Sequence, residues 1–74
     1  METDKGRLAE IDEQIASGRL CIADQKRLIE KLVAGRDDVK GAWEQLILFE
    51  ETLDRMLEQR RLVLKELMRK LLVD

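Results

Sequence analysis

Few side chains in this sequence could carry out catalysis. The 74-residue chain has no histidine and no tyrosine, and its single cysteine is Cys21. General acid–base and nucleophilic catalysis depend mostly on histidine, so neither a catalytic triad nor a histidine phosphotransfer site can be assembled. Carboxylates cluster at residues 10–13 and 50–54, but a di-iron bundle needs Glu-x-x-His pairs. We therefore expect a non-enzymatic protein without a metal or cofactor.

A group of basic residues in the second half could bind nucleic-acid phosphates. It comprises Arg60, Arg61, Lys65, Arg69 and Lys70. The RNA-binding hairpin Rop offers an analogy of fold alone. Acidic residues interrupt the group, no aromatic side chain lies among its members to stack on bases, and the net charge is −2. We interpret the group as a salt-bridged surface and keep a nucleic-acid-binding regulator as the alternative function.

The elements that position these residues are helices. The sequence contains no proline and is 41% charged, which is typical of helical proteins. Seam residues recur at alternating steps of three and four, as in a coiled coil. The first seam contains Leu8, Ile11, Ile15, Gly18, Ile22, Gln25, Ile29 and Leu32. The second contains Val39, Ala42, Leu46, Phe49, Leu53, Leu57, Leu64, Leu67 and Leu71. Two consecutive steps of four around Leu53 predict a stutter in the supercoil.

A turn separates the two seams. Gly35 suits the left-handed position that ends a helix, and Asp37 or Asp38 suits the cap of the next one. We therefore expect one domain over residues 1–74, with a helix at about 4–34, a turn at 35–37 and a helix at about 38–72. A single continuous helix is the alternative. Folding back at the turn places acidic stretches opposite basic ones, which favours an antiparallel hairpin.

Three residues of the first helix depart from a simple seam. Gly18 costs helix stability, and this indicates either a close approach of the helices, filled by Leu53 or Phe49, or a bend. Gln25 either sets the register through a hydrogen bond or lies solvated at the seam edge. Cys21, beside the seam, is either a small half-buried hydrophobe or an intersubunit disulfide.

Further apolar residues lie outside both seams. The predicted interface consists of Trp43, Ile47, Leu48, Leu28, Leu20, Leu62 and Cys21. Monomers tend to avoid large apolar patches, so we expect a homodimer in the form of a four-helix bundle. A monomer with scattered surface residues and a hetero-assembly are the alternatives. Trp43 either anchors the interface or caps the loop end of the bundle core.

The location is predicted from what the sequence does not contain. No apolar run approaches the roughly 20 residues of a membrane span. Residues 1–5 are charged, with no apolar segment behind them, so no signal peptide is visible. With a single thiol as well, the expected location is the cytoplasm, without a membrane partner.

Several motifs carry a resemblance to a group of proteins. They are Ile15-Ala16-Ser17-Gly18, Ile22-Ala23-Asp24-Gln25, Gly35-Arg36-Asp37 and the stretch Leu46-Ile47-Leu48-Phe49-Glu50 with Leu53, Arg61, Leu64, Glu66 and Leu67. Over about residues 11–67 the chain resembles short alphaproteobacterial helical-hairpin proteins, of the kind common in rhizobia. It departs from them at Arg36, where they often carry histidine. The resemblance implies a helical hairpin of unassigned function.

The function that the sequence favours is a small interaction or adaptor protein. It would self-associate through its apolar helix faces and recognise a protein partner by binding a helix in a groove.

Overall fold

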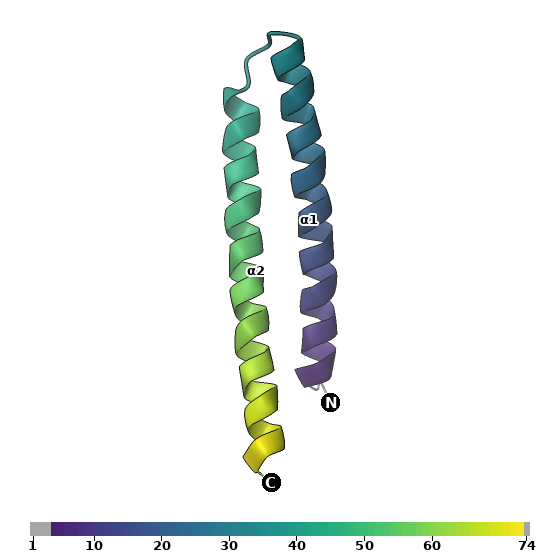
Figure 1. Ribbon diagram of the computed structural model, residues 1–74, viewed down its shortest axis with the longest axis vertical. Coiled ribbons are helices and arrows are strands. Elements are labelled where there is room, and N and C mark those ends of the chain that lie inside the picture. Colours follow the sequence, from purple (N-terminus) through teal and green to yellow (C-terminus); the bar gives the residue numbers. More distant parts are fainter. Residues whose placement is uncertain (1–3, 74) are drawn as a thin grey trace.

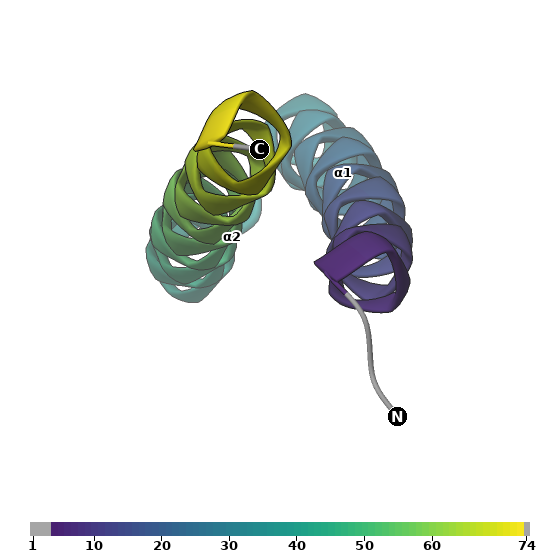
Figure 2. The ribbon, with the colours of Figure 1, turned by 90° about the horizontal axis from the view of Figure 1, so that it is seen from below.

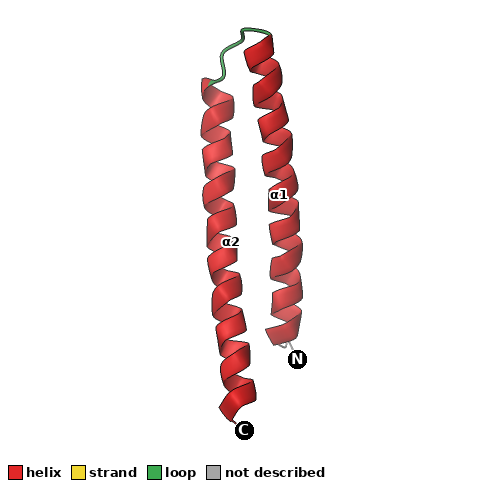
Figure 3. Cartoon of the chain, in the orientation of Figure 1, coloured by secondary structure: helices red, strands yellow, loops and turns green. Residues whose placement is uncertain are grey.

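The computed structural model describes residues 4–73, which form two antiparallel helices (Figures 1 and 3). Helix α1 spans Asp4–Ala34 and helix α2 spans Lys40–Val73. No strand occurs within this part of the chain. The predicted all-α antiparallel hairpin is confirmed, and the alternative of one continuous helix is wrong. The first helix has the predicted bounds, whereas the second begins two residues later than expected.

The hairpin is a single layer of two helices. It measures 61 × 16 × 16 Å, and the view along its axis shows α1 and α2 side by side with no further element over them (Figure 2). A single layer has two broad sides, and within residues 4–73 no other element covers either side. The sequence must therefore provide one buried seam and two sides that face outward.

The predicted seam of α1 is confirmed. All eight of its residues are buried or half-buried, and Ile11, Ile15 and Ile22 are the most buried among them. Ile11 and Ile15 form the centre of the core with Val63 of α2. The alternation of steps of three and four thus keeps one stripe of α1 against α2 over its whole length.

The seam of α2 differs from the predicted one after Leu53. Burial continues through Met56, Arg60, Val63 and Leu67, which keeps the steps of three and four regular. Leu57, which was expected in the seam, is 37% exposed. The predicted stutter is therefore wrong. The reason is that the long apolar stem of an arginine can line a seam while its charged end reaches outward, so Arg60 lies half-buried at the seam edge.

The turn closes α1 in a manner that differs from the prediction. Gly35 does not have a positive φ; Arg36 does, at 58°. The Asp37 N–H donates to the Leu32 carbonyl at 2.8 Å and the Arg36 N–H to the Val33 carbonyl at 3.1 Å. This pair of bonds is the Schellman motif with Arg36 in the left-handed position. The prediction for Gly35 is wrong because the helix-terminating bonds fall one residue later.

The start of α2 is capped by Asp38. Its Oδ1 accepts a hydrogen bond from the Lys40 N–H at 3.0 Å, and this satisfies one of the free N–H groups of the first turn. The Trp43 N–H then donates to the Val39 carbonyl at 2.9 Å. Of the two aspartates predicted as caps, Asp38 supplies the side-chain bond.

Gly18 marks a close approach of the two helices. A Cβ built there would lie 3.1 Å from Met56 Cε and 3.8 Å from Leu53 Cδ1. The prediction that Leu53 fills the space beside Gly18 is confirmed, and Met56 shares that role. The missing side chain therefore offsets its cost in helix propensity by admitting two side chains of α2.

Gln25 forms a hydrogen bond between the helices near the loop. Its Nε2 donates a hydrogen bond to the Ala42 carbonyl at 2.9 Å, and the bond is partly buried. The predicted hydrogen bond of Gln25 is present and the solvated alternative is wrong, while its role in fixing the register stays a prediction. A slip of one helix past the other would leave this half-buried amide without a partner, which costs about 1–3 kcal/mol.

Candidate interaction surface

All seven residues of the predicted interface are exposed in the single hairpin. Trp43, for example, is 53% exposed and Leu62 is 50% exposed. Large apolar side chains at this exposure are available to a partner. The grooves of the hairpin determine which of them share a side.

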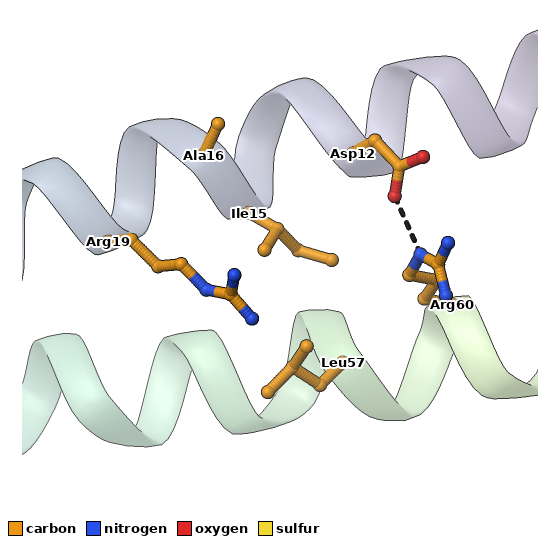
Figure 4. Close-up of a pocket in the computed structure, with 6 residues that line it drawn as sticks. All are labelled: Asp12, Ile15, Ala16, Arg19, Leu57 and Arg60. Atoms are coloured by element: carbon orange, nitrogen blue, oxygen red, sulfur yellow. Dashed lines mark hydrogen bonds and ion pairs between the residues drawn. The ribbon is translucent and has the colours of Figure 1, made fainter.

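Two shallow grooves run along one side of the hairpin. The first is lined by Asp12, Ile15, Ala16, Arg19, Leu57 and Arg60 (Figure 4). The second is lined by Lys26, Ile29, Glu30, Trp43 and Leu46. Each residue of the second groove lies fourteen positions from a residue of the first, which is two full heptads. The two grooves therefore repeat along the same side.

We call this the Trp43 side and define it by the groove residues outside the seam, by Ile47, which lines a further pocket with Trp43, and by the residues spaced seven from them. Helix α2 contributes Lys40, Trp43, Ile47, Glu50, Asp54, Leu57, Arg61, Leu64, Met68 and Leu71. Helix α1 contributes Ala9, Asp12, Ala16, Arg19, Ala23, Lys26, Glu30 and Val33. Large apolar residues thus extend along α2 while alanines recur along α1.

The opposite side, the Cys21 side, is more polar. Its groove is lined by Arg7, Gln59, Leu62, Val63 and Glu66. Steps of seven from these residues add Gln14, Cys21, Leu28, Gln45, Thr52, Leu48 and Arg55. Amides, a hydroxyl and charges separate the leucines here, so no continuous apolar stripe forms.

The predicted interface residues are therefore divided between the two sides. Trp43 and Ile47 lie on the Trp43 side, while Leu48, Leu28, Leu62 and Cys21 lie on the Cys21 side. Leu20 lies on neither, because it is seven residues from Glu13 and from Arg27 on the outer face of α1, and all three are exposed. Sequence reasoning did not assign Leu57 or the three alanines to a surface. The heptad spacing from Trp43 and from Ala16 would have identified them.

Cys21 is a free, exposed cysteine. The interpretation as a half-buried hydrophobe is wrong, because the position beside the seam is less covered in a two-helix layer than in a closed bundle. The intersubunit disulfide stays a prediction.

The basic group of α2 is largely paired with acids. Arg60 Nε donates to Asp12 Oδ1 at 2.6 Å, and Arg69 pairs with Glu66. Arg61 forms two bonds with Glu58, at 2.7 and 3.1 Å. These two bonds lower the pKa of the Glu58 carboxyl and raise the pKa of the Arg61 guanidinium. The remaining members, Lys65 and Lys70, are exposed. The prediction of a salt-bridged surface is confirmed for the three arginines.

Ion pairs between the helices contribute less than the charge pattern predicted. Among the ion pairs of residues 4–73 that are described, Asp12–Arg60 joins the two helices. Arg27–Asp24, Arg61–Glu58 and Arg69–Glu66 each lie within one helix at a spacing of three. Exposed pairs of this kind stabilise by about 0–1 kcal/mol. The apolar seam therefore determines the antiparallel pairing.

No protein-family model, curated protein or solved structure matches the chain. The resemblance to short alphaproteobacterial hairpins accordingly stays a prediction. Within residues 4–73, no group of three or more Cys, Asp or Glu side chains is placed to hold a metal ion, and neither helix could cross a membrane. A function must therefore be argued from the sides of the hairpin.

Proposed function

We propose that the protein is a small, non-enzymatic helical interaction protein that associates with itself to form a four-helix bundle. The observation that carries this proposal is the exposure, among residues 4–73, of eleven large apolar side chains, each at least 37% exposed, on a hairpin of two helices. Trp43 and Ile47 line one pocket, and exposed apolar patches with aromatic anchors are typical of interfaces.

The thin core supports the same proposal. The buried apolar residues within the described part of the chain are Ile11, Ile15, Ile22, Leu46 and Val63. Chains of this size rarely reach adequate stability from one small core and often gain it by association. Each large side chain that a partner covers adds about 1.5–3 kcal/mol before the loss of entropy is subtracted.

An adaptor role follows from the two open sides. Association through one side of the hairpin leaves the other exposed. An amphipathic partner helix could then bind in its groove through anchors spaced three and four residues apart.

The test is the molar mass of the protein in solution. The chain has a mass of 8.7 kDa, and we expect light scattering to give about twice this value over a hundredfold dilution, with and without reductant. A mass of one chain at every concentration would refute the self-association. A dimer that is present only without reductant would attribute the assembly to Cys21 instead of the apolar residues.

A further inference from the structure

We propose that two copies pack through their Trp43 sides with both loops at the same end, so that α1 of each copy lies on α2 of the other. This inference rests on the proposed self-association and specifies its partner, its side and its orientation.

Unpaired charges on the Trp43 side provide the first observation. Arg19 and Lys26 lie on α1, and Glu50 and Asp54 lie on α2. Among residues 4–73 these four side chains form no hydrogen bond or ion pair. In the middle of this side α1 thus presents two cations and α2 two anions, while nearer the loop α1 adds Glu30 and α2 adds Lys40.

The register of the hairpin places these opposite charges at matching heights. Asp12 bonds to Arg60, and Gly18 lies beside Met56. Since the helices run antiparallel at 1.5 Å per residue, Arg19 and Asp54 lie at about the same position along the long axis of the hairpin. We call this position the height of a residue. By the same reasoning, Lys26 lies at about the height of Ile47, roughly one helical turn from Glu50.

Two such layers can meet face to face about a two-fold axis in two ways. An axis along the helices places α1 on the partner's α2, keeps every residue at its own height and brings both loops to one end. An axis across the helices places α1 on the partner's α1 and α2 on the partner's α2, with the loops at opposite ends. The charges distinguish these two arrangements.

The lengthwise axis brings opposite charges together. Arg19 faces the partner's Asp54, Lys26 lies about one helical turn from the partner's Glu50, and symmetry repeats both contacts. The crosswise axis instead brings Arg19 to the partner's Arg19 and Asp54 to the partner's Asp54, because both residues lie near the middle of their helices. Like charges in close contact oppose association, so the charge pattern favours the lengthwise axis.

The sizes of the side chains favour the same arrangement. Ala9 and Ala16 lie on α1 at the heights of Leu64 and Leu57 on α2, and Ala16 and Leu57 line the same groove. The lengthwise axis places each alanine against a leucine of the partner. The crosswise axis would place small residues on small and large on large, which leaves voids beside crowded contacts.

Single-cysteine variants mixed in pairs test the orientation. In chains that also carry Cys21→Ser, we would mix an Arg19→Cys chain with an Asp54→Cys chain and add a short bismaleimide cross-linker. We expect the mixed pair to form a covalent dimer in higher yield than either variant alone. Self-linking of the Arg19→Cys chain above the mixed pair would overturn the proposal in favour of the crosswise axis.

A matched pair on the opposite side is the control. Ser17, exposed and one helical turn before Cys21, lies at about the height of Arg55 on the Cys21 side, so Ser17→Cys and Arg55→Cys should cross-link only at the level of random collision. A higher yield from this pair than from residues 19 and 54 would place the interface on the Cys21 side and overturn the inference. Light scattering of the unmodified protein decides the self-association itself, so the failure of each proposal can be distinguished.

Charge reversal gives an independent readout. Arg19→Glu alone and Asp54→Arg alone should each weaken dimerisation about tenfold, because like charges then face each other twice. Mixing the two variants should restore dimerisation, since every facing pair in the mixed dimer is opposite in charge. A single reversal that leaves the dimer as strong as the unmodified protein would refute the charge pairing.

Discussion

The Trp43 side and the Cys21 side border the same buried seam, yet they present different surfaces. On the Trp43 side, Ile47 continues the apolar surface of the tryptophan and Leu57 resumes it beyond Glu50 and Asp54, while alanines recur along α1. On the Cys21 side, Gln59 and other polar residues separate the leucines. Both sides have the same helices behind them, so the hairpin fold does not require their difference. We infer that the seam residues specify the fold and that the flanking residues specify what binds.

The largest expected effect is on the seam that both sides share. Leu46 is 2% exposed, and Leu46→Ala should lower the free energy of unfolding by about 2–5 kcal/mol, because the lost contacts leave a cavity. Leu48→Ala, two residues away and 54% exposed, should cost less than about 1 kcal/mol in the hairpin. Urea unfolding at one fixed protein concentration measures both. Equal losses of unfolding free energy would contradict the assignment of Leu46 to the core and Leu48 to the surface of the hairpin.

The next effect separates the two sides directly. Trp43→Ala should weaken dimerisation by about 2 kcal/mol, roughly thirtyfold, because it removes an aromatic anchor. Leu62→Ala removes an equally exposed side chain from the Cys21 side and should change the dimerisation constant little. Sedimentation equilibrium gives both constants. A larger effect from Leu62→Ala would reverse the roles assigned to the two sides.

A smaller effect is expected in the loop, which belongs to neither side. Arg36 has φ 58°, and a side chain in this region costs about 1–2 kcal/mol relative to the right-handed region. Arg36→Gly should therefore raise the free energy of unfolding by about 1 kcal/mol, part of the relief being offset by the flexibility of glycine in the unfolded chain. Dimerisation should not change. Arg36→Ala, which removes the charge and keeps the strain, should give no such gain.

The smallest effect concerns pH and Glu58, which lies on the outer face of α2 and pairs with Arg61 at the edge of the Trp43 side. The bonds from Arg61 lower the pKa of Glu58 below its ordinary value of 4.5. The pair therefore stabilises the fold above that ordinary value, and this contribution is lost as the pH falls through the lowered pKa. We expect Glu58→Gln to remove a small part of the acid destabilisation and to leave neutral dimerisation unchanged, as shown by unfolding and sedimentation at pH 7 and pH 3. A weaker dimer at neutral pH would extend the interface from Arg61 to Glu58.

Much of the fold can be predicted from the spacing of residues. Steps of three and four identified every seam residue of α1, Val39 just before α2 and the first four seam residues of α2, since one stripe of a helix must remove its apolar side chains from water. Gln25 was expected to bond across the helices because a half-buried amide needs a partner. The prediction failed at Leu57, where the pattern of leucines suggested a stutter while the regular repeat places Arg60 in the seam.

The candidate surface was predicted less well. Trp43 and Ile47 were correctly identified as exposed apolar residues of α2, but they were grouped with Leu28 and Leu62 of the other side. Apolar character alone does not reveal which side of a hairpin a residue occupies, because that depends on its angle from the seam. The same uncertainty led to a half-buried assignment for Cys21, which is exposed.

The sequence by itself determined the two helices, their ends to within about two residues, and the buried stripe that joins them. These features are local or periodic, so the order of residue types along the chain is enough to specify them. Only the tertiary structure decided the residue that takes the left-handed turn, the ion pair that crosses between the helices and the division of the exposed residues into two sides. Each of these depends on the rotation and register of α1 against α2, which packing sets once the helices have met.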